Sequence, residues 1–220
     1  MQLAQKIIIA DDHPLFRAAL QQAVGKAVPG VEVIEADSLT ALQGTVEQHR
    51  DADLVLLDLH MPGTNGFTGL VYLRGQNPGM PVVVVSGSEE PRVMRRAIDY
   101  GASGFIPKSS PLDVISEAIV AVLEGEVWLP QDMSEGGGVA EDDAAFAAKL
   151  TSLTPQQFRV LMMLTEGLLN KQIAYELNVS EATIKAHVTA ILRKLGVHSR
   201  TQAVIEASRL GVEPPKTELG

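Results

Sequence analysis

Two hydrophobic patterns alternate along the first 128 residues of the chain. Short apolar runs, "KIIIA", "VEVIEA", "LVLLDL", "PVVVVS" and "GFIPK", are separated by longer segments with apolar residues at helical spacing, such as Leu15, Ala19, Leu20 and Ala23. Strands that are apolar throughout and alternate with helices are typical of a parallel sheet covered on both faces. We therefore predict an α/β doubly wound domain with a five-stranded parallel sheet over residues 1–128.

The composition changes after this domain. The stretch "LPQDMSEGGGVAEDDAAFAAKL" contains three consecutive glycines and a cluster of acids. Such a composition buries too little apolar surface to hold one conformation. We predict a flexible linker over residues 129–148, with "AAFAAKL" as a candidate start of a helix.

Residues 149–212 show only helical periodicity and predict a small all-α domain of four helices. Thr154 is placed to cap the first helix, and Gln157 three positions later completes a capping box. Ser180 is placed to cap "EATIKAHVTAILRKL" after the tight turn "NVS". Two helices joined by a tight turn predict a helix-turn-helix. Residues 213–220 are predicted to be a C-terminal tail.

The charge is distributed unevenly along the chain. The net charge is −9, but residues 1–130 hold 9 Lys or Arg against 16 Asp or Glu, whereas residues 151–220 hold 8 against 6. The weakly positive final segment is compatible with a polyanionic partner. The chain has no cysteine, which excludes disulfides and thiolate metal sites, and no apolar run reaches the roughly 20 residues of a membrane span. We expect a cytoplasmic protein with no membrane partner.

Chemically active side chains follow the predicted strands at their carboxyl ends. They are Asp11 and Asp12 after the first strand, Asp58 after the third, Ser86 after the fourth and Lys108 after the fifth. The carboxyl ends of parallel strands share one rim, where ligands of such sheets bind. Grouped carboxylates suit Mg²⁺, and a carboxylate beside such an ion can act as a nucleophile toward phosphorus. A lysine and a hydroxyl would hold the phosphoryl oxygens.

These groups, in this order and within "DDHPLFR" and "LLDLHMPG", resemble the receiver domain of two-component response regulators. The resemblance implies that Asp58 accepts a phosphoryl group from a sensor histidine kinase. It also implies a Mg²⁺ ion held by Asp11, Asp12, Asp58 and the backbone carbonyl of His60. The side chains of His13 and His60 have no other histidine or cysteine at ligand spacing, so we favour ordinary structural roles for both over the alternative of metal ligands or catalytic bases.

The same resemblance implies that Ser86 and Lys108 contact the phosphoryl group. Ser86 and Phe105 would form the switch, in which the aromatic ring moves when the hydroxyl is drawn toward the phosphate. Simple core packing of Phe105 is the alternative. Many receivers have a proline after the lysine, whereas this chain has Ser109 in "PKSS".

The segment after Ser180 is amphipathic when placed on a helix. One face carries an apolar stripe made of Ile184, Val188, Ile191, Leu192 and Leu195. The opposite face carries Lys185, Ala186, Thr189 and Arg193. Small and polar side chains permit close approach to base edges, and basic side chains neutralise phosphates.

Residues 153–204 closely resemble the LuxR-type output domain, which together with a receiver makes the NarL/FixJ class of response regulator. The family's first helix usually begins "TxRE", whereas this one begins "TPQQ". The resemblance implies contact with double-stranded DNA by Lys171, Lys185, Ala186, His187, Thr189, Arg193 and Lys194. For His187, helix packing is an equal alternative. Val204 and Ser208 are implied contacts of a homodimer formed on phosphorylation or on DNA.

The favoured function is a phosphorylation-controlled, sequence-specific transcription factor rather than an enzyme. One alternative is a phosphatase that uses Asp58 as nucleophile toward small phosphoesters. Another is a receiver that acts through protein contacts, with a vestigial output domain. The sequence leaves open whether phosphorylation releases the output domain or promotes its dimerisation.

Overall fold

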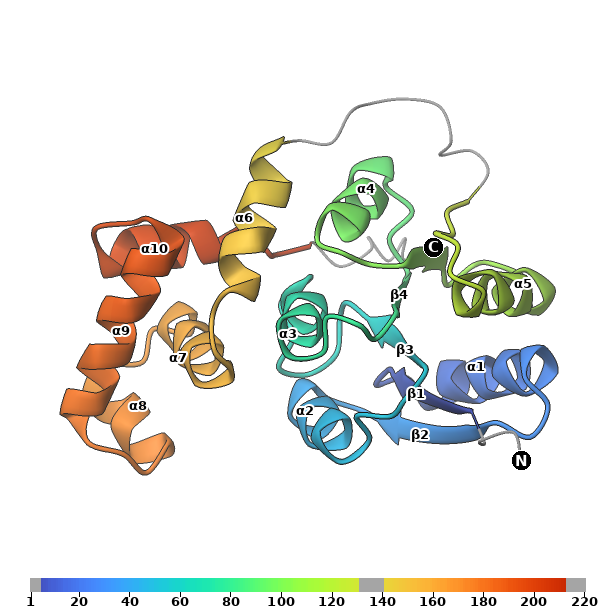
Figure 1. The fold of residues 1–220 in the computed structure, drawn as a ribbon, viewed down its shortest axis with the longest axis horizontal. Coiled ribbons are helices and arrows are strands. Elements are labelled where there is room, and N and C mark those ends of the chain that lie inside the picture. The colour runs from blue at the N-terminus through green and yellow to red at the C-terminus, as the bar shows by residue number, and fades with distance from the viewer. Residues whose placement is uncertain (1–4, 131–140, 213–220) are drawn as a thin grey trace, which may run out of the picture.

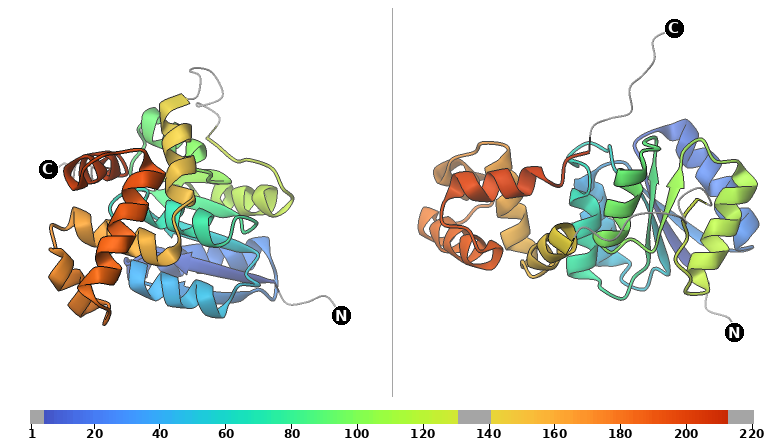
Figure 2. Two further views of the ribbon diagram at one scale, coloured as in Figure 1. Left: turned by 60° about the vertical axis from the view of Figure 1, so that its left-hand side comes forward. Right: turned by 90° about the horizontal axis from the view of Figure 1, so that it is seen from above.

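The computed structural model describes residues 5–130 and 141–212, which form an α/β domain and a helical domain lying side by side (Figures 1 and 2). The predicted tail, residues 213–220, lies outside the described residues. No helix in the described part of the chain is long and apolar enough to cross a membrane.

Five parallel strands form the predicted sheet. They are β1 (Lys6–Ala10), β2 (Glu32–Ala36), β3 (Leu54–Asp58), β4 (Val82–Ser86) and β5 (Gly104–Pro107). Their order is β2-β1-β3-β4-β5, and every pair of neighbours is parallel. The order reverses direction between β1 and β3, so loops leaving these two strands diverge and leave a crevice at their carboxyl ends.

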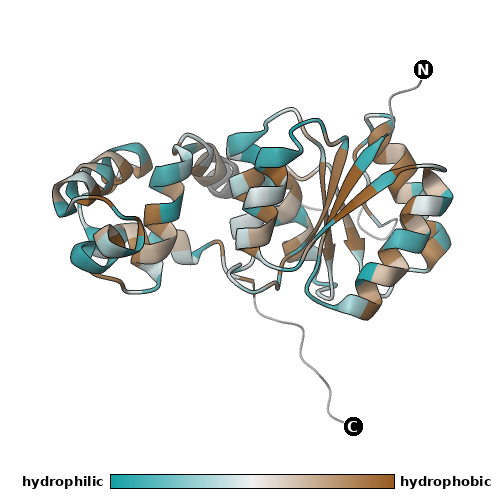
Figure 3. Cartoon of the chain, turned by 90° about the horizontal axis from the view of Figure 1, so that it is seen from below, coloured by the Kyte–Doolittle hydropathy of each residue, from teal (hydrophilic) through white to brown (hydrophobic). Residues whose placement is uncertain are grey.

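Helices cover both faces of the sheet. They are α1 (Pro14–Ala27) and α5 (Leu112–Leu123) on one face, and α2 (Leu39–Gln48), α3 (Thr68–Gln76) and α4 (Pro91–Asp99) on the other (Figure 1). Successive strand residues point to opposite faces, so Ile7 and Ile9 pack in the core under α1 and α5, whereas Ile8 packs under the other three helices. This two-sided burial explains why β3 and β4 are fully buried and mostly apolar, whereas the edge strand β2 contains Glu32 and Glu35; Figure 3 shows a mainly brown sheet with teal bands.

The second half of the predicted linker is helical, which corrects the prediction of a flexible segment through residue 148. Residues 131–140 lie outside the described residues, but α6 occupies Glu141–Thr151. Phe146 and Leu150, four residues apart, are both buried, and α6 packs against α3, α4 and the later helix α9. The helix includes "AAFAAKL", the segment predicted as a candidate start of a helix, and burial of this face against both domains stabilises it.

The remaining helices form the predicted four-helix unit. They are α7 (Pro155–Thr165), α8 (Asn170–Glu176), α9 (Glu181–Leu195) and α10 (Arg200–Ser208). The capping box of Thr154 and Gln157 is present, and the Ser180 side chain accepts a hydrogen bond from the Thr183 amide. Between α8 and α9, Asn178 adopts the left-handed conformation with φ 51°, which makes the tight turn of the helix-turn-helix.

The two domains touch through side chains and through backbone. The ring of Tyr72 on α3 lies 6.1 Å from that of Phe158 on α7, and the Phe67 amide donates a hydrogen bond of 2.9 Å to the carbonyl of Leu210. Gly66 (φ 58°) approaches the chain after α10 so closely that an added Cβ would lie 2.2 Å from the Leu210 carbonyl oxygen. A side chain at position 66 is therefore incompatible with this arrangement.

Candidate functional site: an acidic rim and a helix-turn-helix

Three strand ends bring charged groups together at the predicted rim. Asp11 follows β1, Asp58 ends β3 and Lys108 follows β5. The Lys108 ammonium lies 2.6 Å from Asp11 Oδ2 and 2.9 Å from Asp58 Oδ2, and both carboxylates are about 1% exposed. Buried carboxylates this close repel each other, and the ammonium offsets that repulsion.

The carboxylates form a group that fits a divalent cation. Asp11, Asp12, His13 and Asp58 each offer a ligand atom, and these atoms lie within 4.8 Å of one another. Two buried oxygens, Asp11 Oδ2 and Asp12 Oδ1, accept no hydrogen bond from the described residues, although the first is paired with Lys108. Oxygen donors of this kind are the preferred ligands of Mg²⁺.

The backbone around Asp58 is arranged by the turn that follows it. The His60 amide donates a hydrogen bond of 3.3 Å to Asp58 Oδ1. The Thr64 hydroxyl donates to the carbonyls of Leu59 and Met61, which holds the loop between β3 and α3. The predicted nucleophile is thus held by both an amide and an ammonium.

Ser86 and Phe105 are both fully buried on strands beside the rim. Val85 pairs with Asp58, so Ser86 lies one residue further along the neighbouring strand. The Phe105 amide donates a hydrogen bond of 3.0 Å to the carbonyl of Trp128, the single tryptophan of the chain. The segment that leaves α5 is thereby attached to the β5 edge at the predicted switch residue.

One contributor to the rim was not predicted from the sequence. The Lys108 ammonium lies 4.8 Å above the centre of the Phe16 ring, a cation–π contact. Phe16 is part of the "DDHPLFR" motif, but its contact with a residue 92 positions away depends on how α1 packs against α5 and β1. The aromatic face provides a third partner for the amine besides the two carboxylates.

The helix-turn-helix exposes the face predicted to meet DNA. Ile184, Ile191 and Leu195 are buried, whereas Lys185 and Thr189 are exposed. The Thr189 hydroxyl donates to the Lys185 carbonyl at 3.0 Å, and Lys185 pairs with Glu181 at 3.1 Å. Ala186, Arg193 and Lys171 are also exposed, and His187 is partly buried.

Lys194 differs from the other predicted DNA contacts because its ammonium is engaged inside the domain. It donates to the Ser152 carbonyl at 2.6 Å and to Gln157 Oε1 at 2.9 Å. These bonds attach the end of α9 to the turn between α6 and α7. Contact with a phosphate would require the amine to leave both acceptors.

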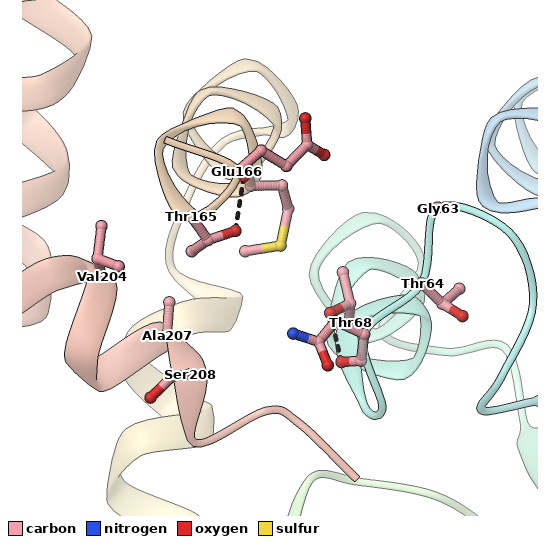
Figure 4. Close-up of a pocket in the computed structure, with 10 residues that line it drawn as sticks. Gly63, Thr64, Thr68, Thr165, Glu166, Val204, Ala207 and Ser208 are labelled. Atoms are coloured by element: carbon pink, nitrogen blue, oxygen red, sulfur yellow. Dashed lines mark hydrogen bonds between the residues drawn. The ribbon is translucent and has the colours of Figure 1, made fainter. Parts of the chain in front are cut away.

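Val204 and Ser208, the predicted dimer contacts, line a pocket between the domains (Figure 4). The opposite wall is formed by Thr64, Asn65 and Thr68 at the start of α3. The predicted dimerisation face of α10 thus looks toward the loop that follows Asp58.

An acidic rim with an opposed lysine, on a doubly wound sheet followed by a helix-turn-helix, defines a receiver joined to a DNA-binding output domain. Comparison with known families agrees: the response regulator receiver domain matches residues 7–120, and the luxR family of bacterial regulatory proteins matches residues 151–207. The chain belongs to the NarL/FixJ-type response regulators, a family of DNA-binding transcriptional regulators of two-component systems.

Several characterised relatives match over nearly the whole chain. The glycerol metabolism activator of Pseudomonas putida is 48% identical, over 92% of this chain and 94% of the relative. The nitrate/nitrite response regulator NarP of Escherichia coli is 34% identical, over 91% and 93%. Among solved structures, the RcsB response regulator of Salmonella typhimurium is similar with a TM-score of 0.55 and 25% identity, over 94% of this chain and 98% of that one. RcsB has also been solved as dimers bound to DNA.

Proposed function

We propose that Asp58 is the phosphoacceptor of this regulator and receives its phosphoryl group from a phosphohistidine of a sensor kinase. The proposal is carried mainly by the position of the Asp58 carboxylate, which is buried at the switch point of the sheet and faces Lys108 at 2.9 Å. A carboxylate oxygen would attack phosphorus while the phosphorus–nitrogen bond to the histidine breaks, leaving an acyl phosphate. Lys108 and Ser86 would then hold the phosphoryl oxygens.

The buried carboxylate oxygens of the rim, two of which accept no hydrogen bond from the described residues, support a Mg²⁺ ion held by Asp11, Asp12, Asp58 and the His60 carbonyl. When bound, the ion would neutralise charge on the phosphoryl oxygens. The chain's own residues orient the nucleophile, through the Lys108 ammonium and the His60 amide. In this proposal Ser86 and Phe105 form the switch beside the phosphate.

For the output domain we propose that α9 enters the major groove. Lys185, Ala186 and Thr189 would face the bases, and Lys171, His187 and Arg193 the backbone. The exposure of all these residues except His187, which is partly buried, supports this assignment. A dimer on DNA would use Val204 and Ser208. The receiver would span residues 1–128 and the DNA-binding domain residues 149–212, both acting in the cytoplasm where bacterial DNA lies.

The domain contact supports a role for release before dimerisation. Three backbone carbonyls that follow α10 contact groups of the receiver. Arg96 donates to the Arg209 carbonyl, the Phe67 amide donates to the Leu210 carbonyl, and the His60 ring nitrogen Nε2 lies 3.4 Å from the carbonyl of Val212.

This contact occupies the surface that a second subunit needs. Thr64, Asn65 and Thr68 of the receiver form the opposite wall of the pocket that Val204 and Ser208 line, so in this proposal the α10 helix of another copy packs there after the receiver has moved away. His60 links the two sites directly, because its amide binds Asp58 and its ring contacts the output domain. We propose that phosphorylation disturbs this residue, separates the domains and exposes α10.

The test uses the full chain and DNA sites selected from a random pool. Affinity is measured with and without beryllofluoride, for the wild type and for Asp58→Asn. We expect the mimic to raise the affinity of the wild type by at least about fivefold, a coupling of about 1 kcal/mol, and to leave the variant unchanged. Equal affinity of the wild type in both states would reject phosphorylation control.

A further inference from the structure

His13 lies at the edge of the acidic rim with its imidazole close to two of the carboxylates. Its Nδ1 atom is 2.8 Å from Asp12 Oδ1 and 3.4 Å from Asp11 Oδ1. Asp12 Oδ1 is one of the two buried oxygens that accept no hydrogen bond from the described residues. The imidazole is therefore the one described group paired with this buried oxygen, and a cation placed between them would be bound by both atoms.

The backbone holds His13 in this place. A residue before proline is excluded from the helical region, and His13, preceding Pro14, is extended with φ −91° and ψ 105°. Its amide donates a hydrogen bond of 2.8 Å to Asp11 Oδ1. Although His13 is the N-cap residue of α1, its side chain makes no capping hydrogen bond, so the imidazole is available for another role.

The distances agree with neighbouring ligands on one ion. Two ligands at right angles, with bonds of about 2.1 Å, lie about 3.0 Å apart, and the two Nδ1–oxygen distances bracket this value. Opposite ligands of such an ion lie about 4.2 Å apart. The four ligand atoms lie within 4.8 Å of one another, so a shift of roughly half an ångström would close the site.

We propose that the His13 imidazole is a direct ligand of the ion at the phosphorylation site and extends its selectivity from Mg²⁺ to first-row transition-metal ions. The inference rests on the metal site of the proposed function and adds one nitrogen to its oxygen donors. Carboxylate and water donors suit Mg²⁺, whereas an imidazole favours ions such as Co²⁺, Ni²⁺ and Zn²⁺. The His13 side chain is 64% exposed, which leaves the solvent side of the ion open to water and phosphoryl oxygens.

The ordinary alternative is an ion pair in which His13 only neutralises Asp12. That pair would be a surface interaction of little energy and would contribute no ligand. The two roles differ in their response to the metal. A ligand contributes more to Co²⁺ binding than to Mg²⁺ binding, whereas a neutralising charge in the rim opposes all divalent ions alike.

The experiment uses the full chain with Mn²⁺ as a spectroscopic probe. Electron spin echo envelope modulation detects a nitrogen bound directly to Mn²⁺. We expect nitrogen modulation in the wild type, its loss in His13→Ala, and its retention in His198→Ala, which removes an exposed imidazole of the output domain. Calorimetric titration should show that His13→Ala binds Co²⁺ about tenfold more weakly and Mg²⁺ within about twofold of the wild type.

The outcomes separate this inference from the function on which it rests. Bound Mn²⁺ without nitrogen modulation, or equal losses of Co²⁺ and Mg²⁺ affinity in His13→Ala, would overturn the ligand role of His13 and leave the carboxylate site intact. Failure of the wild type to bind either ion would overturn both. In Asp12→Asn we expect weaker binding of every ion, since a shared carboxylate ligand is lost.

Discussion

Replacing Gly66 by alanine should force the two domains apart without phosphorylation. In the closed arrangement the new Cβ would lie 2.2 Å from the Leu210 oxygen, 2.5 Å from the Val212 nitrogen and 2.9 Å from the Gly211 carbonyl carbon. All three are backbone atoms, which cannot turn aside as a flexible side chain does. The chain after α10 must therefore withdraw from the receiver.

Withdrawal removes at least the Phe67–Leu210 hydrogen bond and the His60–Val212 contact. Hydrogen bonds contribute about 0.5–1.5 kcal/mol each, so the closed state should lose about 1–3 kcal/mol. This corresponds to a shift of roughly 5- to 150-fold toward the open state. Gly66→Ala also places a side chain at φ 58°, which costs about 1–2 kcal/mol in both states and cancels from this ratio.

The matched control is Gly30→Ala. Gly30 has φ 82°, but an added Cβ would meet nothing within 4 Å, so this variant has the backbone strain without the collision. Fluorescence anisotropy with a labelled DNA site should show that unphosphorylated Gly66→Ala binds more tightly than the wild type, whereas Gly30→Ala does not. Affinity of a folded Gly66→Ala protein that matches the wild type would refute the view that this contact restrains the output domain.

Three further predictions address the phosphorylation site, the DNA contacts and the domain interface. Asp58→Asn should abolish transfer of radiolabelled phosphate from the phosphorylated kinase. Asp53→Asn, which changes an acid outside the rim, should be labelled as strongly as the wild type. Labelling of Asp58→Asn would contradict the assignment of Asp58 as the phosphoacceptor. Lys185→Ala should weaken DNA binding and reduce the slope of log affinity against log salt concentration by about 1. Lys194→Ala should instead lower the melting temperature, because it removes the hydrogen bonds that the Lys194 ammonium donates to Ser152 and Gln157. Burial raises the pKa of the Tyr72 phenol above its ordinary value of 10.0. As the pH rises, the unfolded chain therefore loses this proton before the folded chain does. The phenol's contribution to the free energy of unfolding is fully present below pH 10.0 and is lost at higher pH. In alkaline unfolding curves Tyr72→Phe should show a smaller loss of stability than the wild type, and an equal loss would exclude the phenol as its cause.

Much of the acidic rim follows from local pattern. Continuous apolar runs that alternate with helical segments predict parallel strands, and the carboxyl ends of parallel strands meet at one rim. For that reason Asp11, Asp58 and Lys108 could be grouped from sequence, and the structure places the lysine within 2.9 Å of both acids. The capping box at Thr154 and the left-handed turn at Asn178 are equally local, since each depends on residues within one turn of chain.

The interactions between distant segments required the tertiary structure. The amine of Lys194, which resembles a DNA contact in sequence, is bound to Ser152 and Gln157 because α9 ends against the turn after α6. Helix α6 is stable where its composition predicts a linker, because both domains cover Phe146 and Leu150.

Sequence alone determined the strands, the helices, their caps and the side chains at the strand ends, because backbone preference and burial leave a periodic signal over a few residues. It also carried the motifs by which the family resemblance was found. Only the tertiary structure decided that His60, Phe67 and Arg96 contact backbone carbonyls of the chain that follows α10. Those carbonyls are backbone groups that every sequence contains, and their partners lie more than 100 residues away, so no local pattern records the pairing.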